Sequence, residues 1–194
     1  DEADRSQSQF NPLLAKAGQG SPSNPIKLAE MGDPTGRNHA AFPFLSKSTG
    51  NFYIVGGDEN FPWGVRATRG EPSNPRGGFH FLNFTDPENP KEDAVYQVPE
   101  AGSHNMWIFG DVLIAGNYQG GLRIVDISGE LLGDIYNQGR EIAVYQSSHK
   151  EGKIPNAPMV WGAQPYKDYI FFADMNSGLY CIQLEDLEKG PGAP

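Results

Sequence analysis

The fold is decided by Asp111-Val-Leu-Ile-Ala-Gly-Asn117 and by Gly121-Leu-Arg-Ile-Val-Asp-Ile127, which begins ten residues after Asp111. Both are short apolar runs bounded by Gly, Asn or Asp, a pattern typical of buried β-strands. The first pattern recurs at residues 51–57 and 168–174, and the second recurs at 78–84 and 178–184. The chain is therefore expected to contain an internal repeat of short strands.

The spacing of the two patterns indicates the size of the repeat. Gly78 and Gly121 lie 43 residues apart. Asn51 and Asp111 keep the same period once a 17-residue insertion in the first unit is allowed for. A period of about 40 to 45 residues made of short strands is typical of a four-stranded propeller blade. A β-sandwich whose strands are similar by chance is the alternative.

A first strand precedes each pair of patterns and begins at His39, at His104 or at Trp161. Turn-forming residues then lead into outer strands, which are expected at Ala94–Val98, at Ile135–Tyr136 and, for a preceding blade, at Ile26–Met31. The third unit ends at Leu184 with no outer strand of its own. We therefore predict an all-β fold, a β-propeller of which about three four-stranded blades are visible and which is part of a larger propeller.

The chain divides into a propeller and two flanking segments. Residues 1–20 are expected to be an extended or mobile N-terminal segment, and residues 189–194 form a Gly/Pro-rich tail. Residues 21–188 are predicted to form the propeller, in segments 21–32 (the outer strand of a preceding blade), 39–100, 103–138 and 158–186. Propellers have about 4–8 blades, and this chain does not begin with Met. We therefore expect a processed or partial chain whose upstream blades are missing or supplied by another chain.

The composition excludes several classes of protein. With 24 Gly and 16 Pro among 194 residues, long helical bundles and coiled coils are poor candidates. A net charge of −9 and a pI near 4.8 argue against generic nucleic-acid binding, which needs clustered Lys and Arg. No apolar run approaches the roughly 20 residues that span a bilayer. The one cysteine, Cys181, cannot form an internal disulfide and is expected to be a small core residue.

One segment carries a resemblance to a known family. Gly120-Gly-Leu-Arg-Ile-Val-Asp-Ile-Ser128 resembles the signature of the LVIVD-repeat proteins, and further matches lie at residues 86–90, 98–105 and 177–179. The resemblance covers about Ser21 to Asp186 and implies a β-propeller. It also implies an exported protein that is periplasmic, secreted or surface-associated, often without a known activity. Chains of that family are usually much longer than this one.

Two histidines are candidate metal ligands. His39 and His104 begin equivalent strands, so in a propeller both would point toward one mouth of the central channel. Two imidazoles can hold a transition metal when a third ligand is near. Asp58 is predicted as that ligand, and Glu59 and Asp174 also follow second strands. The alternative is that both histidines cap their strands by hydrogen bonding to neighbouring backbone.

The insertion at residues 60–76 is a candidate protein interface. Trp63, Arg66 and Arg69 place a large aromatic ring and two cationic groups on one loop, in contrast with the acidic body of the protein. Trp and Arg are enriched at the energetic centres of protein interfaces. The alternative is a loop that folds back over its own blade, with Trp63 filling a gap.

Motifs for the common enzyme classes are missing from the sequence, which has no G-x-S-x-G, G-x-x-x-x-G-K-[ST] or H-E-x-x-H. We therefore expect a non-catalytic, exported interaction scaffold or subunit of a larger assembly, whose partner is a protein or further propeller blades. The alternative is a metal-dependent oxidoreductase or hydrolase with its site at the channel mouth around His39 and His104. No cofactor is expected for the scaffold, and a transition metal is expected for the alternative. Neither a nucleic-acid partner nor a membrane span is expected.

Overall fold

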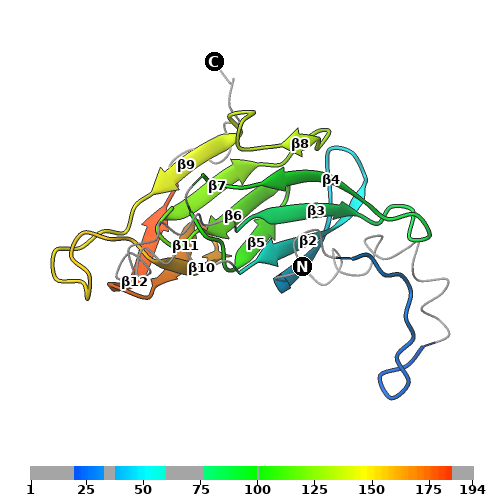
Figure 1. Cartoon of the computed structure of the whole chain (residues 1–194), viewed down its shortest axis with the longest axis horizontal. Helices are drawn as coiled ribbons and strands as arrows, with labels where there is room; N and C mark the ends of the chain where they lie inside the picture. The colour runs from blue at the N-terminus through cyan, green and yellow to red at the C-terminus, as the bar shows by residue number, and fades with distance from the viewer. Residues whose placement is uncertain (1–19, 33–37, 60–76, 100, 185–194) are drawn as a thin grey trace, which may run out of the picture.

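The computed structural model describes residues 20–32, 38–59, 77–99 and 101–184. Within these ranges the chain forms twelve strands and no helix (Figure 1). The strands make three sheets of five, four and three strands. The prediction of an all-β fold is therefore confirmed, and the closed propeller stays a prediction. None of the described residues forms a helix long and apolar enough to cross a membrane.

Apart from the short strand β8, the three sheets follow one another along the chain. The first sheet has the order β1 (Asn38–Leu45), β2 (Phe52–Asp58), β3 (Phe79–Asn83), β4 (Lys91–Tyr96) and β8 (Gly133–Asp134). The second sheet has the order β5 (Met106–Phe109), β6 (Val112–Gly116), β7 (Leu122–Asp126) and β9 (Glu141–Tyr145). The third sheet has the order β10 (Val160–Tyr166), β11 (Tyr169–Asp174) and β12 (Gly178–Gln183). Neighbouring strands are antiparallel, except that β8 runs parallel to β4.

The second sheet contributes to two hydrophobic cores, because successive residues of a strand point to opposite faces. The face that packs against the first sheet includes Leu113, Ala115 and Val125. The face that packs against the third sheet includes Ile114, Leu122 and Ile124. The second sheet is therefore covered on both sides, and the third sheet lies at one end of the molecule (Figure 1).

The pairing of second with third strands defines corresponding positions in the three sheets. Gly57 pairs with Phe79, Gly116 pairs with Leu122, and Ala173 pairs with Leu179. The third strands therefore correspond as their sequence patterns predict. The second strands differ by one residue from the alignment of their sequence patterns. The patterns align Gly57 with Asn117, whereas in the structure Gly57 corresponds to Gly116.

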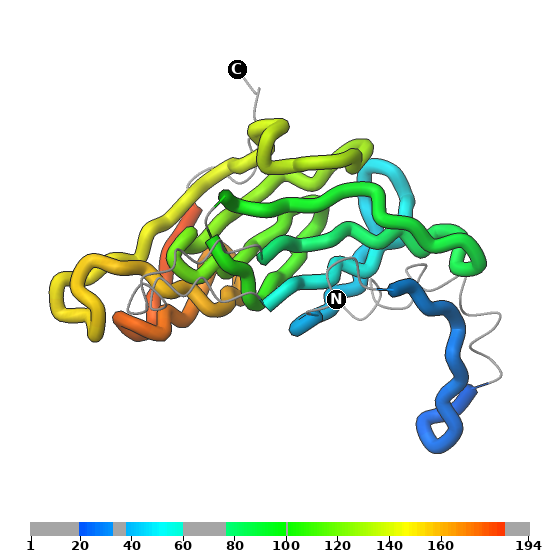
Figure 2. Tube along the Cα trace, viewed as in Figure 1, coloured from blue at the N-terminus to red at the C-terminus, as the bar shows by residue number. Residues whose placement is uncertain are grey.

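Residues 26–31, where an outer strand of a preceding blade is predicted, form no strand in this structure and run away from the sheets (Figure 2). The turn that precedes them is present, with Ser21 and Asn24 exchanging two backbone hydrogen bonds. An alternating apolar pattern forms a strand only where a sheet edge is there to pair with it, and the pattern does not specify that edge.

The predicted outer strand at Ile135–Tyr136 is also misplaced. β8, directly before it, pairs with β4 of the first sheet, and the Ile135 amide donates to the carbonyl of Val95. The fourth strand of the second sheet is β9, which is not among the strands predicted from the sequence. Its sequence, Glu-Ile-Ala-Val-Tyr, does not alternate between apolar and polar residues, and three of its five side chains are exposed.

The third sheet has only three strands in the described part of the chain, as the sequence pattern predicts. Its strand β12 carries Cys181, which is exposed and not a core residue. The pattern of apolar residues shows that β12 is a strand, but it does not show which face of the strand another sheet covers. The face that carries Cys181 is uncovered.

The second and third sheets approach each other closely at Gly116. A Cβ atom on Gly116 would lie 2.6 Å from the carbonyl oxygen of Trp161, which is nearer than real Cβ contacts. That oxygen accepts a hydrogen bond from the Asn105 amide at 3.0 Å, so it joins the start of the second sheet to the third. Gly57 occupies the corresponding place in the first sheet, where a Cβ would lie 3.2 Å from the carbonyl oxygen of His104.

Replacing Gly116 by Ala is expected to destabilise the protein by about 1–3 kcal/mol, because the new methyl group must push the backbone at Trp161 away. The matched control is Gly32→Ala, where the new Cβ meets nothing within 4 Å. Urea unfolding followed by tryptophan fluorescence measures both variants. Equal midpoints for the two variants would show that the sheets do not depend on this close approach.

Candidate functional site

The two predicted histidines meet where the first strands of the first and second sheets lie side by side. The rings of His39 and His104 have centroids 4.1 Å apart, and the ring of Trp161 lies 5.1 Å from that of His104. His39 and Trp161 are both the extra residue of an irregularity in strand pairing. Such bulges redirect side chains, and here they bring the predicted strand starts into one row of rings.

Glu59 is the carboxylate that reaches the two histidines. Its Oε2 lies 3.1 Å from Nδ1 of His39, and its Oε1 lies 3.6 Å from Nε2 of His104. The side chains of His39 and Glu59 are 32% and 27% exposed, while that of His104 is buried. One ligand atom from each of the three residues lies within 4.8 Å of the others. The group therefore combines two imidazoles and a carboxylate at a position that solvent can reach.

The hydrogen bond to Trp161 fixes the protonation of the His104 ring. Nδ1 of His104 lies 3.1 Å from the carbonyl oxygen of Trp161, and a carbonyl can only accept. Nδ1 therefore carries a proton. Burial and the neighbouring His39 lower the pKa of His104 to about 4, although Glu59 opposes the shift. At neutral pH the ring is uncharged, so Nε2 presents a lone pair toward Glu59.

Tyr118 supports Glu59 and was not predicted from the sequence. Its hydroxyl donates to Oε1 of Glu59 at 2.9 Å. Its backbone has a φ of 44°, a left-handed conformation that costs free energy for a bulky residue. Two hydrogen bonds with the backbone of Val160 hold it there. Burial and the bond to Glu59 raise the pKa of Tyr118, so its hydroxyl stays a donor at neutral pH.

The other two carboxylates after second strands have different partners. Asp58 lies next to Glu59 in the chain, and neighbouring residues of an extended strand point to opposite sides. Its Oδ2 lies 3.1 Å from Nε2 of His80, away from the pair formed by His39 and His104. Asp174 accepts hydrogen bonds from the amides of Met159 and Asn176 and from the hydroxyl of Ser147. Of the three carboxylates, the structure places only Glu59 with the two histidines.

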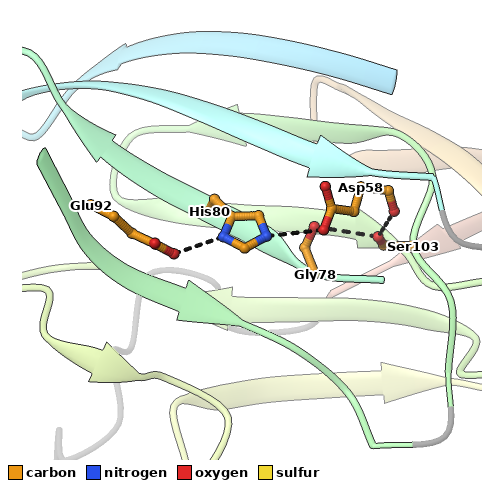
Figure 3. Close-up of polar contacts among 5 residues, drawn as sticks. All are labelled: Asp58, Gly78, His80, Glu92 and Ser103. Atoms are coloured by element: carbon orange, nitrogen blue, oxygen red, sulfur yellow. Dashed lines mark hydrogen bonds and ion pairs between the residues drawn. The ribbon is translucent and has the colours of Figure 1, made fainter. Parts of the chain in front are cut away.

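A second polar cluster lies inside the first sheet (Figure 3). The buried ring of His80 lies between two carboxylates, with Nδ1 2.7 Å from Oε1 of Glu92 and Nε2 3.1 Å from Oδ2 of Asp58. The hydroxyl of Ser103 donates to the backbone carbonyls of Asp58 and Gly78. In a Ser–His–Asp triad the hydroxyl contacts the imidazole, so this cluster has a different arrangement.

The two carboxylates favour the protonated form of His80. Burial lowers the pKa of His80, but the hydrogen bonds to Glu92 and Asp58 outweigh burial and raise it above its usual value. In the second sheet the position that corresponds to His80 is Arg123, which forms a 2.7 Å ion pair with Glu141. Both third strands thus pair a cation with a glutamate of the fourth strand. This correspondence was the sequence signal that could have identified His80.

His80 is expected to make stability depend on pH. Its folded pKa is above its unfolded value of about 6.5, so its contribution is complete below about pH 6.5 and is lost as pH rises through the folded pKa. At pH 6, His80→Gln should cost about 3–5 kcal/mol, because it leaves Asp58 buried without its cation.

Urea midpoints measured between pH 6 and pH 9 test this expectation. The wild type should lose more stability over this range than His80→Gln, and the exposed-loop variant His149→Gln should behave as the wild type. A wild-type slope equal to that of His80→Gln would mean that His80 is neutral in the folded protein.

The predicted interface residues Trp63, Arg66 and Arg69 lie outside the described residues. No family model matches the chain, and no curated protein matches it. Among solved structures, the chain is similar to the computationally designed Ika4 protein, with 8% identity and a TM-score of 0.42 over 74% of this chain. The chain spans 64% of the length of that protein.

Proposed function

We propose that this protein is a non-catalytic β-propeller scaffold whose third sheet docks a further β-sheet. The observation that carries the proposal is the exposed apolar face of that sheet. The corresponding face of the second sheet is buried. A sheet that packs in this way on one side and is open on the other is suited to receive another sheet.

The exposed face can be compared with its buried counterpart position by position. In the second sheet, Ile114, Leu122 and Ile124 are buried against the third sheet. The corresponding residues of the third sheet are Phe171, Leu179 and Cys181. Phe171 is 47% exposed, Leu179 is 88% exposed and Cys181 is exposed. Tyr166 and Tyr169, which pair with each other on the same face, are 63% and 43% exposed. We call these five residues the docking face.

The occupant that fits the docking face is another sheet of the same kind. Within the chain, the first sheet packs on the second and the second on the third, each through alternating apolar residues. A fourth sheet would continue this packing and cover the docking face. Strand β12 is also an edge in the described part of the chain, and edge strands offer unpaired backbone groups to a further strand. Both features favour further propeller blades as the partner.

The arrangement of the first strands supports the propeller. In a propeller, the first strand of every blade lines a common axis. The row of rings from His39 through His104 to Trp161 is formed by residues at the starts of three successive first strands. A ring of about 4–8 such sheets would close around that axis. The LVIVD-like segment, residues 120–128, supports an exported, extracytoplasmic protein, because proteins with that repeat are usually exported.

A metal-dependent enzyme is the second candidate, and one observation favours it. His39, Glu59 and His104 lie together, and two histidines with a glutamate form the ligand set of a class of catalytic zinc sites. An enzyme of this kind would lose its activity when a chelator removes the metal. Binding through the docking face would be unchanged by the chelator, so this treatment distinguishes the two candidates.

The isolated chain is expected to self-associate through the docking face, because a second copy is then the sheet that is available to cover it. The double variant Phe171→Arg/Leu179→Arg should weaken this association by roughly tenfold or more, since charged side chains would have to be buried. The control is Ile154→Arg, another apolar side chain that is 48% exposed but lies outside the sheets.

Sedimentation velocity over a range of concentrations measures this association. The double variant should have a mass near 21.2 kDa, while the wild type and Ile154→Arg should form larger species. Circular dichroism checks that the double variant remains folded. A wild type that stays at 21.2 kDa at every concentration, or a double variant that associates as strongly as the wild type, contradicts the proposal.

A further inference from the structure

We infer that His39, Glu59 and His104 form a binding site for a divalent transition-metal ion of the zinc class. This site lies at the starts of the first strands and uses none of the residues of the docking face. The inference therefore stands independently of the proposed scaffold function.

The donor atoms are of the right kind and nearly at the right separation. Imidazole nitrogen and carboxylate oxygen suit Zn²⁺, with bonds of about 2.0–2.2 Å in a tetrahedral arrangement. Ligand atoms in such an arrangement lie about 3.3–3.6 Å from one another. The separations from Glu59 are 3.1 Å to His39 and 3.6 Å to His104, and all three ligand atoms lie within 4.8 Å of one another. Small side-chain adjustments would complete the geometry.

The strongest argument is the contact between His104 and Glu59. Nδ1 of His104 donates to the carbonyl of Trp161, so Nε2 of the neutral ring is an acceptor. It lies 3.6 Å from a carboxylate oxygen, which is also an acceptor. Two lone pairs facing each other repel unless a proton or a cation lies between them. A metal cation satisfies both acceptors at once.

The surrounding contacts are those that orient metal ligands in proteins. A ligating histidine usually donates its other ring nitrogen to a carbonyl or a carboxylate, and ligating carboxylates are usually hydrogen bonded. The carbonyl of Trp161 holds His104 in this way, and the hydroxyl of Tyr118 holds Glu59. With three protein ligands and partly exposed His39 and Glu59, a fourth position is left for water or another small ligand.

Zinc titration of the full chain tests the site. The protein is stripped with a chelator and dialysed, and ZnCl₂ is then added in a calorimeter. We expect one Zn²⁺ per chain in the wild type, and an affinity lower by roughly tenfold or more in Glu59→Gln and in His39→Ala. The matched control His149→Ala removes a histidine from an exposed loop and should bind as the wild type does. Zinc should also raise the melting temperature of the wild type and of His149→Ala, but not that of Glu59→Gln or His39→Ala.

The variants are chosen so that misfolding cannot imitate a lost site. Glu59→Gln keeps the shape of the side chain, and His39 is one-third exposed, so both changes are compatible with the fold. Cobalt gives a second measurement, because the visible absorption of bound Co²⁺ reports its ligands and should change in Glu59→Gln. The inference is overturned if the wild type shows no saturable zinc binding below about 1 mM, or if the two variants bind as tightly as the wild type. Neither result bears on self-association through the docking face.

Discussion

The carbonyl oxygen of Trp161 is the point on which both the packing of the sheets and the candidate metal site depend. It accepts a hydrogen bond from the amide of Asn105, and this bond ties the second sheet to the third. It also accepts a hydrogen bond from Nδ1 of His104, which sets the tautomer of that ring. Its position is open only because Gly116 has no side chain. One backbone oxygen thus connects the spacing of two sheets to the direction in which a histidine presents its lone pair.

The same neighbourhood explains why a strained residue lies beside the site. Tyr118 keeps its left-handed backbone because both its amide and its carbonyl pair with Val160, on the strand that also carries Trp161. From there its hydroxyl reaches Glu59 on the first sheet. The site therefore draws on all three sheets: two histidines and a carboxylate from the first and second sheets, and supporting backbone from the third. A site built in this way forms only when the sheets pack correctly.

Much of the fold and part of the site could be predicted from the sequence. Apolar runs at equal spacing determine which strands are buried, so the all-β class and the alignment of the third strands followed from them. The meeting of His39 with His104 followed from their equal places before those runs. Glu59 could be grouped with its neighbour Asp58 but not chosen over it, because that choice depends on which side of the strand each points to. Strand β9 was missed because its sequence lacks the alternation of apolar and polar residues, and its pairing with β7 is what identifies it as a strand.

In the described part of the chain, the third sheet lacks two side-chain contacts that the first two sheets have. In those sheets a cation of the third strand, His80 or Arg123, pairs with a glutamate of the fourth strand.

Glu141 also accepts a hydrogen bond from the hydroxyl of Tyr96, and this bond links the outer strands of neighbouring sheets. The third sheet has Tyr180 at the corresponding position and no fourth strand among the described residues, so neither the pair nor the link can form. The same sheet leaves its apolar face exposed. One further sheet could cover this face and also pair a strand with β12, so the partner that we propose, another sheet, would account for the open face and for the unpaired edge.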